Sequence, residues 1–133
     1  MQSNSDPQLP LGSKTHSMKL AFHGGEIYFL HLDAFGLRED LVLDRIAADA
    51  PTMLRPSYPA FVGINIDETV LTPRIMEAVA NVLADARKVF RKAAIVGCGR
   101  KDQRAFEKSL QAADVTYPVA FFRDFEKAKE WLI

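Results

Sequence analysis

Two short segments of the sequence combine residues capable of chemistry with residues that form loops. The first contains Asp67, Glu68, Thr69 and Thr72, which follow the apolar run AFVGINI. Loops at the carboxyl end of a strand are where open α/β sheets place their binding sites. A phosphate on a threonine there would meet free N–H groups and a favourable dipole at the start of the next helix. The two neighbouring carboxylates would oppose that charge.

The same hydroxyl groups also have structural interpretations. Thr72 precedes Pro73 at the start of a helical pattern. Its hydroxyl is expected to cap that helix by accepting a hydrogen bond from an unpaired N–H group. Thr69 is expected to be an exposed loop residue. Asp67, Glu68, Thr69 and Thr72 together form a candidate regulatory or interaction loop.

The second segment is VGCGRKD, residues 96–102. Gly97 and Gly99 allow close backbone approach, and Arg100 and Lys101 stand at the start of the next helix. These four residues form a candidate anion-binding loop. The segment lacks the Gly-Lys-Ser/Thr ending of a P-loop and the third glycine of a dinucleotide fingerprint. A simple tight turn is the competing interpretation.

No combination of residues predicts catalysis or metal binding. Cys98 is either a reactive thiol near a helix amino terminus or, as we favour, a small buried hydrophobe. His16, His23 and His31 have no partners at ligand spacing. The sequence contains no nucleophile elbow, Ser-His-Asp arrangement or paired-carboxylate site. We therefore expect neither an enzyme nor a bound metal or cofactor.

Composition narrows the class of protein. The 133 residues suit one domain, with 48% hydrophobic and 26% charged residues. A formal net charge of zero argues against a nucleic-acid binder. No apolar run reaches the ~20 residues needed to span a bilayer. Residues 1–17 have no apolar signal region and are expected to be a flexible leader, so we predict a cytoplasmic protein.

The remaining sequence, residues 18–133, predicts alternating strands and helices. A hairpin is expected at 18–23 and 26–33 around a Gly-Gly pair. A helix is expected at 37–50, ending at Pro51, with Leu43, Ile46, Ala47 and Ala50 on its apolar face. The later elements are strands at 60–66, 93–98 and 117–122 and helices at 73–90, 100–114 and 124–133, with Asp124 placed to cap the last helix. The order ββαβαβαβα, with four helices, predicts an α/β fold whose mainly parallel sheet opens with the hairpin.

This order resembles the STAS domain of bacterial anti-sigma-factor antagonists, the SpoIIAA-like group. The stretches INIDETVLTPRIMEAV, KAAIVGCG and VAFFRDFEKAKEWL resemble small bacterial STAS-like proteins without an assigned activity. The resemblance implies a STAS-like fold and a non-catalytic protein-interaction or regulatory role. In the antagonists, a serine in an Asp-Ser-Ser-Gly loop is phosphorylated. Here Asp67 keeps the leading acid and Thr69 lies where that serine would fall, but the Ser-Ser-Gly core is absent.

Three alternatives remain open. SEC14-type domains have a related sheet topology, which would imply a binder of a small apolar ligand or lipid. An enzyme using the Gly97-Cys98-Gly99 turn is the second. A homodimer formed through an exposed sheet edge is the third. The preferred partner is another protein.

Overall fold

The computed structural model describes residues 17–55 and 60–133, so the predicted leader lies outside the described residues except for Ser17. The elements occur in the predicted order. They are β1 (Met18–Phe22), β2 (Gly25–His31), α1 (Glu39–Met53), β3 (Phe61–Asn65), α2 (Pro73–Asp85), β4 (Lys92–Val96), α3 (Arg100–Ala112), β5 (Val119–Phe122) and α4 (Phe125–Leu132). The predicted α/β class is confirmed. No helix within these residues combines the length and apolar character needed to cross a bilayer.

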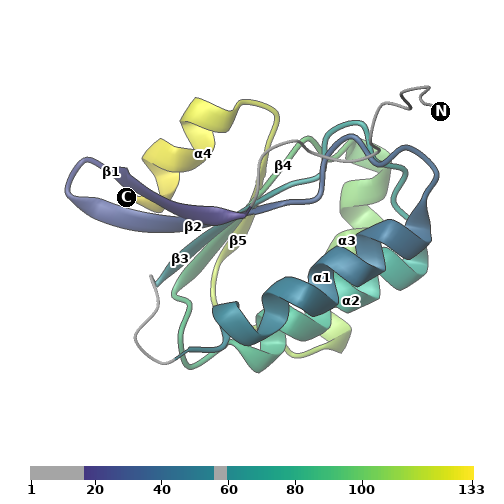
Figure 1. Cartoon of the computed structure of the whole chain (residues 1–133), viewed down its shortest axis with the longest axis horizontal. Helices are drawn as coiled ribbons and strands as arrows, with labels where there is room; N and C mark the ends of the chain where they lie inside the picture. Colours follow the sequence, from purple (N-terminus) through teal and green to yellow (C-terminus); the bar gives the residue numbers. More distant parts are fainter. Residues whose placement is uncertain (1–16, 56–59) are drawn as a thin grey trace, which may run out of the picture.

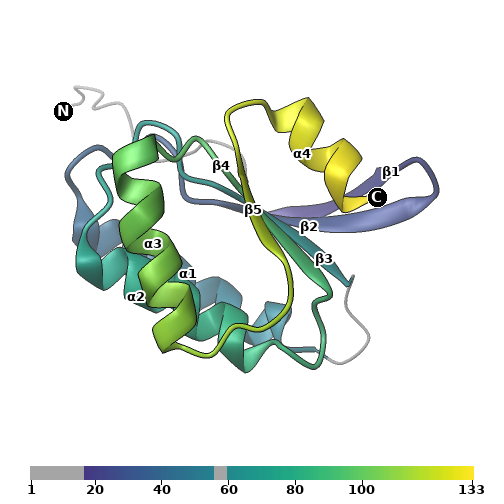
Figure 2. The ribbon, with the colours of Figure 1, turned by 180° about the vertical axis from the view of Figure 1, so that it is seen from behind.

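The five strands lie side by side in chain order, β1-β2-β3-β4-β5. The β1–β2 pair is antiparallel and the three following pairs are parallel. Successive right-handed crossovers in one direction place their helices on the same face. Accordingly α1, α2 and α3 cover one face of the sheet, and α4 covers the other (Figures 1 and 2).

The predicted hairpin is confirmed, but its two-residue turn is His23-Gly24 rather than the Gly24-Gly25 pair. His23 and Gly24 have φ values of 46° and 84°. Two consecutive positive φ values match the right-handed twist of the flanking strands. Gly25 is already part of β2.

Successive side chains of the strands point to opposite faces of the sheet and contribute to two apolar cores. The larger core, beneath α1–α3, includes Leu30, Ile64 and Phe106. The smaller core, beneath α4, includes Phe29 and Leu132. The absence of alternation in the β3 sequence thus reflects burial on both faces, as predicted.

Helix α1 corrects one prediction. Pro51 was expected to end this helix, but it lies inside α1, which continues to Met53. Proline in a last turn removes one intrahelical bond, while the fully buried side chain of Met53 holds that turn against the core. The buried residues of α1 are Val42, Ile46 and Met53. The predicted apolar face was therefore rotated, and Ala47 is exposed.

Helix α2 ends earlier than the predicted residue 90. Its last helical residue is Asp85, and the chain then turns through bonds from the N–H groups of Val89 and Phe90 to the carbonyl of Ala86. Phe90 remains buried. The turn lets the apolar ring enter the core while the chain reverses direction into β4.

Candidate functional site

Both predicted loops lie at one end of the sheet. The connections that leave β2, β3 and β4 gather there, beside the residues that follow β5 (Figures 1 and 2). Parallel strands bring their carboxyl ends to a common edge, which is the usual site position in such sheets. The site therefore has to be built from the loops at this edge.

The loop after β2 and the loop after β3 continue the parallel pairing beyond the strands. We call residues 32–38 and 66–72 the paired loops. Their backbone hydrogen bonds run from Leu32 N to Asn65 O (2.8 Å), Ala34 N to Asp67 O (2.8 Å), Gly36 N to Glu68 O (3.0 Å) and Val70 N to Gly36 O (2.8 Å). This ladder makes the paired loops a rigid frame rather than two independent connections.

Thr69 holds the paired loops together. Its hydroxyl donates to the carbonyl of Leu32 (2.6 Å) and accepts from the N–H of Phe35 (3.1 Å). The expectation of an exposed residue is wrong, because Thr69 is only partly exposed. A bond partner more than 30 residues away is invisible to local sequence reasoning. The Thr69 hydroxyl is therefore already engaged in two hydrogen bonds.

Thr72 is the predicted N-cap of α2. Its hydroxyl accepts a hydrogen bond from the N–H of Ile75 (3.2 Å). It also donates to the Glu39 carboxylate at the start of α1. Arg74 binds the other oxygen of Glu39 (3.2 Å). Thr72 is therefore a structural link between two helix amino termini.

The remaining residues of the paired loops present an apolar and acidic surface. The side chains of Leu37 and Val70 are 83% and 48% exposed. Asp67 and Glu68 are exposed, and neither carboxylate forms an ion pair among the described residues. We call these four residues the loop surface. Sequence reasoning missed Leu37 and Val70, although an apolar residue inside a charged loop was the available signal.

The second predicted loop packs on the first. Gly97 has φ of 92°, and a Cβ there would lie 2.8 Å from both the Cα and N of Asp67. Only glycine fits this close approach. Gly99 is the N-cap of α3 and has no side chain with which to bond the first N–H groups of the helix. The tight-turn interpretation thus accounts for Gly97. Gly99 leaves the first N–H groups of α3 without a side-chain cap.

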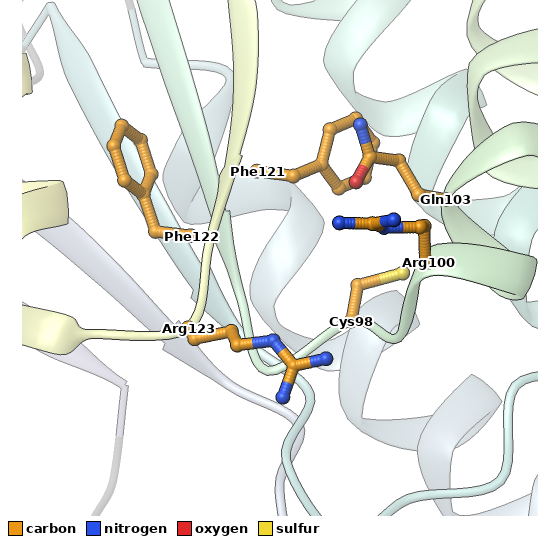
Figure 3. A pocket seen from close by; sticks show the side chains of 6 residues that line it. All are labelled: Cys98, Arg100, Gln103, Phe121, Phe122 and Arg123. Carbon is orange, nitrogen blue, oxygen red and sulfur yellow. The ribbon is translucent and has the colours of Figure 1, made fainter.

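Two adjoining hollows of about 190 and 220 Å³ lie beside this turn. They share Cys98 and Arg123 in their linings, so they form one feature, which we call the arginine hollow (Figure 3). Its lining residues are Asp67, Gly97, Cys98, Gly99, Arg100, Gln103, Phe121, Phe122 and Arg123. Lys101 is not among them, although the sequence grouped it with Arg100. Arg123, just after β5, was missed because it is distant in sequence.

Cys98 lies at the floor of this feature as a buried thiol. Its side chain is within 3.5 Å of the Gly99 carbonyl. Burial, together with the charges of Asp102 and Glu107, raises the pKa of the Cys98 thiol to about 11. Such a thiol carries almost no thiolate near neutral pH, which disfavours nucleophilic catalysis.

Of the described histidines, His31 lies at this edge, as the last residue of β2, and His23 does not. His23 is in the hairpin turn, and His31 is buried with its Nδ1 atom 3.4 Å from Asp33 Oδ1. His16 lies outside the described residues. Within residues 17–55 and 60–133, no group of three or more His, Cys, Asp or Glu side chains is placed to hold a metal ion.

Compared with protein-family models, curated proteins and solved structures, the chain matches none. A functional assignment therefore has to come from the fold and the chemistry of this edge. Chemically, the edge offers a rigid apolar and acidic surface beside a cationic hollow with a protonated thiol.

Proposed function

We propose that this protein is a non-catalytic interaction module with a STAS-like fold, which binds a partner protein through the loop surface. The arrangement that supports the fold assignment is the hairpin-opened parallel sheet with three helices on one face and one on the other. The resemblance in the carboxyl half of the sequence adds to that support. Fold alone does not determine function, so the proposal depends on the surface chemistry.

The observation that carries the proposal is the exposure of Leu37 and Val70 on a rigid frame. Leu37 leaves 83% of its surface in water and Val70 leaves 48%. Both are attached to backbone that is held by the ladder of the paired loops. A preformed apolar surface loses little conformational entropy on binding, so it favours association.

The charges of the loop surface define the partner. Asp67 and Glu68 flank the apolar side chains and have no ion-pair partners among the described residues. A complementary protein surface would present an apolar side chain flanked by lysine or arginine. Thr69 has a structural role in this proposal, because its hydroxyl is hydrogen-bonded to the Leu32 carbonyl and to the Phe35 N–H.

The test is capture of partners from the native cell, followed by native mass spectrometry. The Leu37→Ser/Val70→Ser double variant should lose the partner that the unmodified protein retains. Leu54→Ser/Met18→Ser is the matched control, because Leu54 and Met18 are 40% and 46% exposed and lie outside the paired loops. Equal recovery of the same partner with both double variants would refute the proposed surface, provided that thermal unfolding shows all three proteins folded.

The apolar-ligand alternative receives less support. Four hollows on the described residues measure about 140, 190, 220 and 310 Å³, so only the last of these four reaches the lower end of the range of ligand pockets. Pockets for small-molecule ligands usually occupy about 300–1,000 Å³. The same mass spectra would show a retained apolar ligand or a homodimer. One measurement therefore tests both the apolar-ligand alternative and the homodimer alternative.

A further inference from the structure

We propose that the arginine hollow is a binding site for a phosphate monoester dianion. The arginine hollow adjoins the loop surface and shares Asp67 with it, but the two arginines that carry this proposal are not part of the loop surface. It rests on two guanidinium groups that line one hollow of suitable size, with the start of α3 as an additional source of donors.

The two guanidinium groups come from different elements. Arg100 belongs to the first turn of α3, and Arg123 directly follows β5. Both line the same hollow, and Figure 3 shows their side chains on the two sides of Cys98, with Arg100 extending above it and Arg123 below it. Among the described residues, neither takes part in a hydrogen bond or ion pair given by the structure. A dianion between them would relieve their repulsion and accept charge-assisted hydrogen bonds from both.

The surrounding groups add hydrogen-bond donors. Gln103 lines the hollow with its side-chain amide. The first N–H groups of α3 have no intrahelical acceptors, and Gly99 supplies no capping oxygen. In α2 and α4, by contrast, Thr72 and Asp124 fill that role with their own side chains. An oxyanion beside Arg100 would complete the cap of α3.

Shape and charge select the ligand class. The hollows of about 190 and 220 Å³ have room for a phosphate group and a short organic stem. Phe121, whose ring lies on the same side of β5 as Arg100 and Gln103 in Figure 3, provides an apolar contact for that stem, and Asp67 lines the second of the two hollows. The phosphate monoester could belong to a free small molecule or to a phosphorylated side chain, since both present the same dianion.

The first experiment titrates inorganic phosphate into the protein at constant ionic strength and follows backbone amide NMR signals. We expect saturable shifts at Gly99, Arg100 and Gln103. In Arg100→Gln/Arg123→Gln the affinity should fall by at least about tenfold, as expected from loss of charge-assisted hydrogen bonds. Arg55→Gln/Arg91→Gln is the control with the same charge change. Both arginines are exposed. Arg55 lies after the end of α1 and Arg91 lies directly before β4, away from the hollow.

A third variant, Asp67→Asn, should act in the opposite direction and tighten phosphate binding, because it removes a carboxylate from the lining of the hollow. An unchanged amide spectrum elsewhere verifies folding of each variant. Absence of saturable shifts in the unmodified protein would overturn the proposal. Equal weakening by the Arg100/Arg123 and Arg55/Arg91 pairs would also overturn it, because that result indicates a nonspecific charge effect.

A second set of titrations distinguishes the two sources of the phosphate. The probes are glycerol phosphate, a phosphoserine-containing hexapeptide and the same peptide without phosphate. Tighter binding of the phosphopeptide than of glycerol phosphate would support a phosphorylated side chain as ligand. Equal binding of those two would support a small phosphate monoester. Equal binding of the two peptides would contradict the proposal, because the phosphate would then contribute nothing.

Discussion

The hydroxyl group of Thr69 makes two hydrogen bonds that join the loop after β2 to the loop after β3. At the residue scale, this is the contact on which the loop surface depends. Replacement by valine keeps the shape but leaves the Leu32 carbonyl and the Phe35 N–H without this partner. A phosphate at the same position would also remove the donor.

We therefore expect Thr69→Val to lower the free energy of unfolding by about 1–3 kcal/mol. Thr69→Ser, which retains the hydroxyl, should lose much less. Urea unfolding at equilibrium measures both. Thr116→Val is the control, because Thr116 is exposed. Equal stability of the Thr69→Val and Thr116→Val proteins would contradict this structural role.

The Cys98 thiol provides a second prediction at this scale. Its pKa is raised from 9.0 to about 11, first by burial and then by Asp102 and Glu107. Alkylation by iodoacetamide should be far slower in the folded protein than in the urea-unfolded protein at neutral pH. Comparable alkylation rates in the two states would show that the thiol is accessible and ionised.

The same pKa shift predicts a loss of stability in alkali. The folded protein holds the thiol proton more tightly than the unfolded chain does. The corresponding stability is fully present below pH 9.0 and is lost as the pH rises toward about 11. Urea midpoints across this window should decline less steeply for Cys98→Ala. If the urea midpoints of the unmodified protein and of Cys98→Ala decline equally, the loss of stability in alkali comes from other groups. Tyr117 is one such group, because burial also raises its pKa.

At the scale of elements, helix α2 begins at a residue that serves two helices. Thr72 caps α2 through the N–H of Ile75 and donates to Glu39 in the first turn of α1. Thr72→Ala should reduce the free energy of unfolding by about 1–2 kcal/mol. Glu39→Ala and the Thr72/Glu39 double variant complete a mutant cycle by urea unfolding. Strictly additive effects would argue against the link between the helices.

The helix boundaries show where local signals are sufficient. The caps at Thr72 and Asp124 were predictable because a cap bonds to N–H groups only two or three residues away. The extension of α1 past Pro51 was not, since it follows from burial of Met53 against the sheet. The end of α2 at Asp85 likewise follows from the return of the chain to β4.

At the scale of the whole molecule, α4 covers its face of the sheet through a contact that spans three elements. The Phe29 ring of β2 lies over Gly63 of β3, where a Cβ would come within 2.2 Å of the ring. The same ring stacks on Phe125 of α4, with centroids 4.5 Å apart. Gly63 therefore makes room for the ring that anchors the last helix.

Gly63→Ala should lower the free energy of unfolding by about 1–3 kcal/mol, because the added methyl group forces the ring to move. Amide hydrogen exchange should rise in α4 more than in α1. Phe29→Leu should recover part of the loss when combined with Gly63→Ala, because the smaller side chain leaves space. This packing would be contradicted if the two substitutions changed the free energy of unfolding additively and if amide hydrogen exchange in α4 were unchanged.

The sequence by itself determined the features that depend on neighbouring residues. These are the order of the elements, the hairpin, and the caps of α2 and α4. The alternation of strands with helices along the chain was also enough to predict a mainly parallel sheet. The tertiary structure decided which distant groups meet. It brought Thr69 to the Leu32 carbonyl and placed Arg123 beside Arg100. It also put α4 opposite the other helices. These outcomes depend on which strands lie side by side, and the pairing of strands is a property of the complete chain rather than of any local pattern.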